Sequence, residues 1–76
     1  MNFIITRTSD EDRKPCRGAY QDKMNTSYGK EDVYRIKINS LEELMKLIKK
    51  YGTIIIGPHF DNEEETHIEI YDDYRE

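Results

Sequence analysis

The chain has 76 residues, a net charge of −4 and charged side chains at 37% of its positions. A chain this short buries only about 60% of the surface that it exposes when unfolded, so it has room for one small core but not for a large enclosed active site. The single cysteine, Cys16, cannot form an intrachain disulfide, and no stretch reaches the roughly 18 apolar residues that a membrane span needs. We therefore expect a reduced, cytoplasmic setting and no membrane segment.

Charge is unevenly distributed along the chain. The net charge is +2 over residues 1–30, +1 over residues 31–60 and −7 over residues 61–76. The apolar residues are clustered rather than scattered, which argues against a disordered chain despite the mean hydropathy of −0.95. The sequence therefore predicts a folded molecule whose weakly basic body ends in a strongly acidic segment.

The first predicted element is a strand over Met1–Thr6, and a long loop over residues 7–32 follows it. This segment contains Gly, Pro, Ser and Asn without a sustained period, and loops of such length are often functional or mobile. It also carries aromatic and basic side chains of the kind that can track a nucleic-acid backbone: Tyr20, Tyr28, Arg13, Lys14, Arg17 and Lys23. Acidic residues, among them Asp10, Glu11, Asp12 and Asp22, dilute this charge, so a plain solvated loop is the alternative.

A strand and a helix are predicted next. Val33–Ile38 alternates so that Tyr34, Ile36 and Ile38 share one face. Ser40 and Glu43 then form an S-x-x-E capping box, the usual start of a helix. Apolar residues recur at helical spacing as far as Tyr51, and Gly52 can adopt the left-handed conformation that ends a helix. The pattern predicts a helix over residues 41–51.

Two further strands are predicted after the helix. Thr53–Ile56 is a continuous β-branched run, typical of a strand that is covered on both faces or lies at the centre of a sheet. Residues 61–65 form a polar turn, and His67–Tyr71 alternates with Ile68 and Ile70 on its buried face. The last two strands should therefore form a hairpin.

The order of elements predicts an α+β fold of the ββαββ type. One helix would pack on one face of a mixed four-stranded sheet, in a two-layer sandwich whose strands before and after the helix run parallel through a right-handed crossover. The opposite sheet face would be largely open. Polar and aromatic side chains would project from it and suit contact with another macromolecule, including a second copy of the chain: Val33, Arg35, Lys37, His67, Glu69 and Tyr71.

Residue types suited to catalysis or metal binding do not form a recognisable motif. His59, Asp61 and His67 lack the spacing of a zinc site, so exposed histidines are the favoured interpretation. Cys16 could pair with either histidine, but nothing in its irregular segment would hold a base beside it. No phosphate-binding or dinucleotide-binding motif is present. We therefore expect no enzymatic activity, no metal and no cofactor.

The acidic C-terminal segment has two interpretations. It could simply be a solvated edge that prevents strand pairing between molecules. Alternatively, carboxylates fixed partly on a strand could imitate a phosphate backbone and steer the protein onto a basic nucleic-acid-binding cleft, with tyrosines as interface anchors. The residues predicted to bind a partner in this way are Glu63, Glu64, Glu65, Glu69, Tyr71, Asp72, Asp73 and Tyr74.

The run SLEELMKLIKKYGTIII followed by IEIYDDYRE resembles small proteins carried by phages and other mobile elements of Gram-positive bacteria. Many anti-CRISPR and other anti-defence inhibitors come from that pool. The resemblance spans roughly residues 39–76 and assigns no functional residue. It implies a small acidic protein that binds and blocks a larger nucleic-acid enzyme. The alternative is a nucleic-acid-binding accessory module that uses the basic segment.

Overall fold

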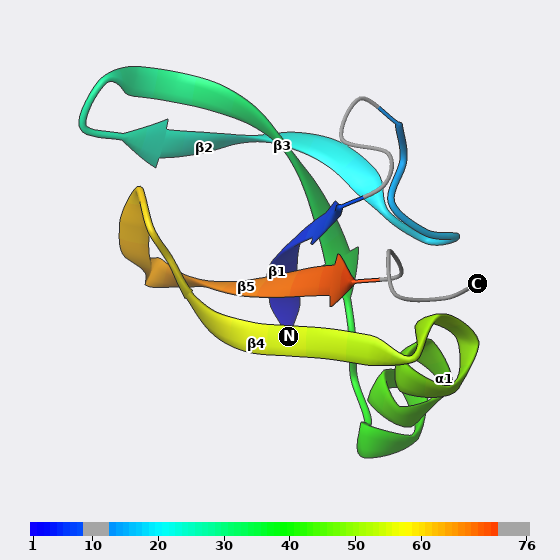
Figure 1. Ribbon diagram of the computed structural model, residues 1–76. Helices are drawn as coiled ribbons and strands as arrows, with labels where there is room; N and C mark the ends of the chain where they lie inside the picture. The colour runs from blue at the N-terminus through cyan, green and yellow to red at the C-terminus, as the bar shows by residue number, and fades with distance from the viewer. Residues whose placement is uncertain (9–12, 72–76) are drawn as a thin grey trace.

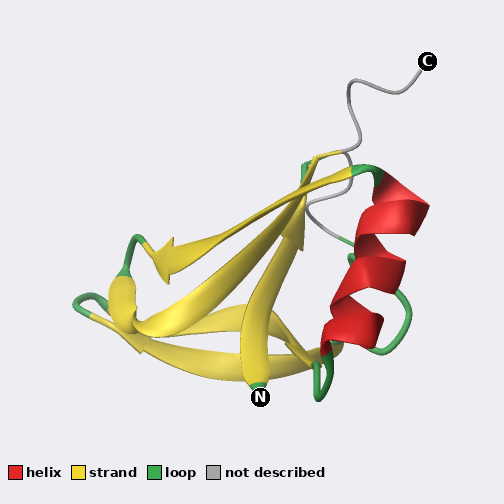
Figure 2. Ribbon diagram, turned by 90° about the horizontal axis from the view of Figure 1, so that it is seen from below, coloured by secondary structure: helices red, strands yellow, loops and turns green. Residues whose placement is uncertain are grey.

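The computed structural model describes residues 1–8 and 13–71. Within these ranges the chain forms β1 (Asn2–Arg7), β2 (Tyr20–Thr26), β3 (Gly29–Lys37), α1 (Leu41–Tyr51), β4 (Thr53–His59) and β5 (Asn62–Tyr71). The strands make one mixed sheet in the order β2-β3-β1-β5-β4, and α1 packs on one of its faces (Figure 1 and Figure 2). The α+β class with one helix on a mixed sheet is as predicted, but the sheet has five strands rather than four.

The additional strand, β2, lies within residues 7–32, where the sequence predicted only a loop. It pairs antiparallel with β3 from Tyr20 opposite Arg35 to Thr26 opposite Gly29. Strand β3 accordingly begins at Gly29 and not at the predicted Val33. Met24 is the one fully buried residue of β2. The strand therefore lacks the apolar alternation by which a half-buried strand is recognised.

The topology places β1 at the centre of the sheet. It pairs antiparallel with β3 and parallel with β5, and β5 pairs antiparallel with β4. Strands β3 and β4 run in the same direction, as predicted, but β1 and β5 lie between them. The prediction that Thr53–Ile56 is covered on both faces is wrong, because β4 is an edge strand in which Ile55 and Ile56 are 52% and 46% exposed.

The helix forms where the sequence predicted it. The hydroxyl of Ser40 accepts the N–H of Glu43 at 3.3 Å, as in a capping box. The Glu43 carboxylate accepts the N–H of Asn39, the residue before the cap, at 2.9 Å. Gly52 ends the helix with φ of 95° and donates its N–H to the carbonyl of Ile48. The main core lies between α1 and the sheet. Its central residues are Ile5, Ile36, Ile38, Tyr51, Ile68 and Ile70, with Leu44 and Leu47 packed against them.

The opposite sheet face is not the open surface that the sequence predicted. The sheet curls (Figure 2), and Ile4 and Met24, which lie outside the main core cluster, are only 1% and 2% exposed. The side-chain amide of Asn62 donates to the carbonyl of Asn25 at 3.0 Å, so the β4–β5 hairpin contacts the β2–β3 hairpin. We call this inner side of the curled sheet the concave face. Because side chains and the hairpin contact partly fill the concave face, it offers no flat surface for pairing with a second copy of the chain.

Candidate functional site

Two hairpin turns lie side by side at one end of the molecule (Figure 1 and Figure 2). The β2–β3 turn carries Tyr28 and the β4–β5 turn carries Phe60. These side chains are 90% and 83% exposed, the highest values among the large apolar side chains of the described residues. Aromatic side chains are enriched at protein interfaces, where they contribute a large contact area. The paired turns are therefore a candidate binding surface.

Local contacts hold both aromatic residues in place. The backbone N–H of Tyr28 donates to the hydroxyl of Thr26 at 3.1 Å, which fixes the turn. The Phe60 ring stacks on the buried His59 ring with 4.8 Å between centroids. The Nδ1 atom of His59 in turn accepts the backbone N–H of Asp61 at 3.1 Å. A partner would thus meet a Phe60 ring whose position is largely set before binding, which lowers the entropic cost of association, whereas the contact at Tyr28 fixes only the backbone of its turn.

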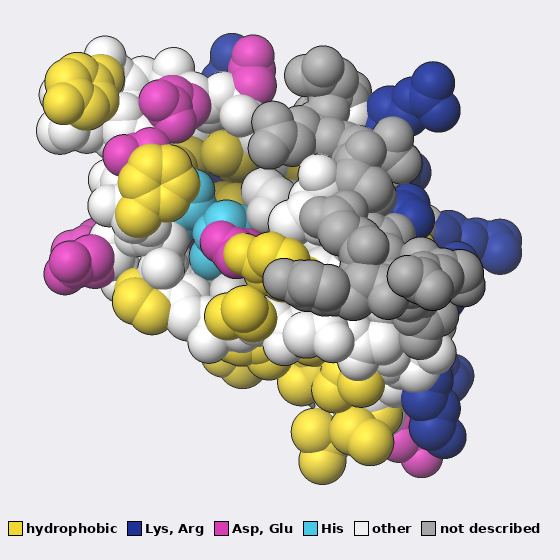
Figure 3. Space-filling view, viewed as in Figure 1, with side chains coloured by type: hydrophobic (Ala, Val, Ile, Leu, Met, Phe, Trp, Pro, Cys, Tyr) yellow, Lys and Arg dark blue, Asp and Glu magenta, His cyan; other side chains and the backbone are white. Residues whose placement is uncertain are grey.

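Carboxylates surround these two rings. Glu31, Glu63 and Glu64 are exposed and Asp61 is half-buried, while Lys30 adds one positive charge. Figure 3 shows that most of the visible acidic side chains lie on the side of the hairpin turns, and that Lys and Arg gather on the opposite side. We define the acidic tip by its two aromatic and four acidic residues: Tyr28, Phe60, Glu31, Asp61, Glu63 and Glu64.

The predicted partner-binding residues do not form one continuous row. Glu63 and Glu64 belong to the acidic tip, but they are neighbours on β5 and point to opposite faces. Glu69 accepts a hydrogen bond of 2.5 Å from the hydroxyl of Tyr71. Glu65 is paired with Arg35. The remaining three, Asp72, Asp73 and Tyr74, lie outside the described residues. The sequence reasoning missed Phe60, whose signal was an aromatic side chain within a polar turn, and it assigned Tyr28 to a nucleic-acid-binding loop rather than to this surface.

Arg35 spans the concave face between two strands that are not neighbours of each other. Its guanidinium lies 2.6 Å from Glu65 on β5 and 2.9 Å from Asp22 on β2. The Arg35 side chain is only 11% exposed. The hydrogen bond that Arg35 donates to Glu65 is the main cause that raises the pKa of Arg35, so the guanidinium stays charged. This cross-sheet pairing makes Arg35 and Glu65 structural residues and removes them from the exposed binding surface.

His67 lies beside Arg35 on the same face and is also buried. Its Nε2 atom is 2.9 Å from the hydroxyl of Thr6, and its Nδ1 atom is 3.8 Å from Glu69. Burial lowers the pKa of His67, and the nearby His59 lowers it further, whereas Glu69 opposes the shift. The imidazole is therefore neutral at physiological pH.

The order of hydroxyl, imidazole and carboxylate in this cluster is that of a nucleophile, a base and an orienting acid. Two observations argue against such chemistry. The separation of 3.8 Å between His67 and Glu69 exceeds hydrogen-bonding distance, and Glu69 already accepts the Tyr71 hydroxyl. The adjoining hollow measures about 70 Å³, whereas ligand sites usually measure about 300–1,000 Å³. We assign the cluster a packing role.

Other catalytic and metal-binding combinations considered from the sequence are not brought together. Cys16 packs in the helix-side core cluster, whereas His67 hydrogen-bonds Thr6 on the concave face, so the sheet separates thiol from imidazole. Burial also raises the pKa of Cys16, which keeps it a thiol. His59 and His67 are neighbours, with ring centroids 5.0 Å apart. In residues 1–8 and 13–71, however, no three His, Cys, Asp or Glu side chains are grouped so that they could hold a metal ion.

The predicted nucleic-acid-binding residues occupy two separate places. Arg13, Lys14 and Arg17 are exposed in the segment before β2. Lys23 lies on β2, where it forms an ion pair with Asp32. The structure adds helix lysines to the first group, because Lys46 and Lys50 line the same hollow as Arg17 and Lys37. We call this group the basic end: Arg13, Lys14, Arg17, Lys37, Lys46 and Lys50.

Comparison with known proteins finds no matching family model, no matching curated protein and no matching solved structure. The helix found in the described ranges is too short and too polar to cross a membrane.

Proposed function

We propose that the protein is a non-enzymatic inhibitor that binds a larger protein and occupies a basic, nucleic-acid-binding surface on it. The observation that carries this proposal is the acidic tip, where two exposed aromatic rings and four carboxylates lie on two neighbouring hairpins. Negative charge steers the tip toward a basic cleft, and the rings supply the contacts that slow dissociation. The sequence resemblance to phage and mobile-element proteins supports an anti-defence role, with an anti-CRISPR inhibitor as the leading form.

The size of the chain is compatible with this mechanism. A protein interface of standard size buries about 800 Å² on each partner. The chain exposes 5682 Å² in all, so one end of the molecule can supply such an interface. A small protein that covers a basic cleft needs no catalytic group, because occupying the cleft excludes the nucleic acid.

An affinity experiment with matched variants tests the proposal. Wild-type protein, a tip variant (Tyr28→Ala, Phe60→Ala, Glu63→Lys, Glu64→Lys) and a control variant (Lys46→Gln, Lys49→Gln) are immobilised and exposed to bacterial lysate. We expect a nucleic-acid-binding protein to be retained by the wild type and the control but not by the tip variant. The purified partner should then lose its nucleic acid when one equivalent of wild-type protein is added. A partner that is retained equally by the tip variant would contradict the mechanism.

The basic end favours a second candidate function, direct binding of nucleic acid as an accessory module. Arg13, Lys14 and Arg17 lie on one exposed segment, and phosphate contacts by such side chains dominate non-specific affinity. If this function holds, replacing these three residues with alanine abolishes gel retardation of DNA or RNA. Lys23→Ala is the matched control, because Lys23 is paired with Asp32 and lies outside the basic end. Absence of retardation by the unmodified protein rules this candidate out.

A further inference from the structure

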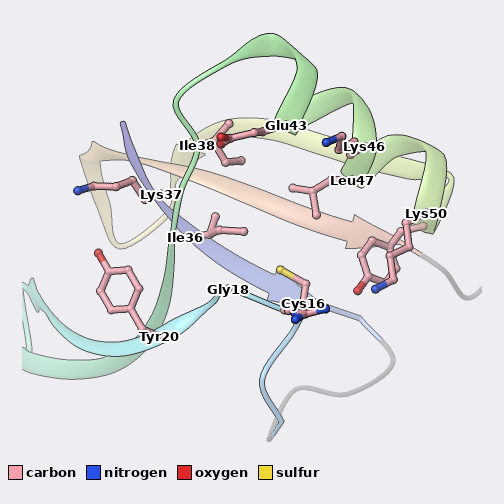
Figure 4. A pocket seen from close by; sticks show the side chains of 12 residues that line it. Cys16, Gly18, Tyr20, Ile36, Lys37, Ile38, Glu43, Lys46, Leu47 and Lys50 are labelled. Atoms are coloured by element: carbon pink, nitrogen blue, oxygen red, sulfur yellow. The ribbon is translucent and has the colours of Figure 1, made fainter.

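The basic end contains a cavity with a largely apolar floor. It measures about 490 Å³ and opens between α1, β3 and the segment before β2. This volume falls within the range of about 300–1,000 Å³ that is usual for small-molecule sites. Figure 4 shows Leu47 of α1, Ile36 of β3 and the sulfur of Cys16 directed toward the same space. We call this cavity the basic-end pocket.

The floor of the pocket is apolar. Cys16, Ile36 and Ile38 are each 7% exposed and belong to the main core cluster, and Leu47 packs against that cluster. These side chains cannot hydrogen-bond a ligand, so they favour an aliphatic body over a polar one. A nucleic-acid base fits less well. Tyr51 also lines the pocket, but the cationic groups of Arg7 and Lys50 lie 5.0 Å and 5.4 Å from the centroid of its ring. These contacts leave little of the ring for stacking with a base.

The rim of the pocket is positively charged. Arg17, Lys37 and Lys46 are exposed, and no carboxylate of the described residues forms an ion pair with any of them. Lys50 adds a fourth positive charge. The single acidic residue of the lining, Glu43, is engaged in the helix cap through its hydrogen bond to the Asn39 N–H. A ligand carboxylate at this rim would therefore meet Arg17 and Lys46, which no carboxylate of the described residues neutralises.

We propose that the basic-end pocket binds an amphipathic organic anion of the fatty-acid class. The acyl chain would lie on Ile36, Ile38 and Leu47, and the carboxylate would contact the ammonium group of Lys46 on α1. The site does not overlap the acidic tip. Binding of the anion is therefore independent of the proposed inhibitory function, and either can fail without the other.

Titration with hexanoate, octanoate and decanoate tests the proposal on the full chain. Binding is followed by amide chemical shifts and by the rate at which a neutral maleimide modifies Cys16. We expect the dissociation constant to fall about fourfold for each added CH₂, the effect of burying one methylene group. Bound decanoate should also slow modification of Cys16 at least fivefold, because the thiol lies in the floor of the site.

Matched variants identify the contacts. Lys46→Gln should weaken decanoate binding about tenfold, whereas Lys49→Gln and Lys30→Gln, outside the pocket, should leave it unchanged. Decanol tests the charge requirement and should bind at least tenfold more weakly than decanoate. Equal affinity for decanol, no protection of Cys16, or shifts confined to residues outside the pocket would overturn the proposal. Protection of Cys16 by single-stranded DNA or by an acidic peptide, but not by decanoate, would also overturn it.

Discussion

Arg35 is the residue on which the shape of the concave face depends most. Its pairs with Asp22 and Glu65 tie β2 to β5 across β3 and β1. Because both carboxylates would lose a charged donor, Arg35→Gln should lower the free energy of unfolding by roughly 1.5–3 kcal/mol. Urea denaturation measures the change. Lys23→Gln is the control, since its pair with Asp32 is largely exposed and should contribute less than about 1 kcal/mol. Equal losses of unfolding free energy in the two variants would show that the Arg35 pairs stabilise the fold no more than an exposed ion pair does.

His67 should make the stability of the fold sensitive to mild acid. Its pKa in the folded state lies below the unfolded value of about 6.5. Above pH 6.5 both states hold the neutral ring. As the pH falls below 6.5, the unfolded state takes up a proton first and the folded state loses stability. We expect the urea midpoint of the wild type to fall more between pH 7 and pH 5.5 than that of His67→Gln. Parallel profiles for the two proteins would exclude this role of His67.

Local signals made α1 the most predictable element of the fold. The capping box of Ser40 and Glu43, the apolar stripe and Gly52 each agree with the observed helix. Ser40→Ala should cost about 1 kcal/mol, because the N–H of Glu43 loses its acceptor. Thermal unfolding measures this loss, and Ser27→Ala in the β2–β3 turn is the matched control. If the two variants unfold at the same midpoint temperature, the cap contributes no stability.

Sheet position is an example of what the sequence could not show. Thr53–Ile56 is apolar on both faces, yet β4 ends up at the edge, because order in a sheet depends on long-range pairing and not on the local pattern. Likewise, β2 carries polar residues and becomes a strand through its pairing with β3. The candidate site was predictable in part. The acidic residues were evident from composition, but the approach of the two hairpins that carry Tyr28 and Phe60 requires the curl of the sheet (Figure 2).

The exposed edge of β4 should promote self-association. No charged side chain occurs between Thr53 and Pro58, so pairing with a second copy would place no like charges opposite each other. We expect sedimentation velocity to show weak association that rises with concentration. Ile56→Lys should abolish it while the circular dichroism spectrum stays unchanged. A wild-type protein that remains monomeric at millimolar concentration would contradict this expectation.

At the scale of the whole molecule, the charged side chains of the described residues are divided between two ends. The acidic tip stands at the hairpin turns, and Lys and Arg gather on the opposite side (Figure 3). Such a charge dipole orients the protein as it approaches a basic partner, so that the tip arrives first. The rate of association should then depend on salt, whereas the exposed rings of Tyr28 and Phe60 should mainly control the rate of dissociation.

The most direct test of the inhibitor mechanism is a displacement titration with the captured partner bound to labelled nucleic acid. The proposal predicts complete release at one equivalent of wild-type protein. Raising the salt from 50 to 300 mM should weaken this effect at least tenfold, and Glu63→Lys with Glu64→Lys should abolish it. The Lys46→Gln, Lys49→Gln control should act like the wild type. Release that is equally strong with the charge-reversed tip, or that is insensitive to salt, would contradict the proposed mechanism.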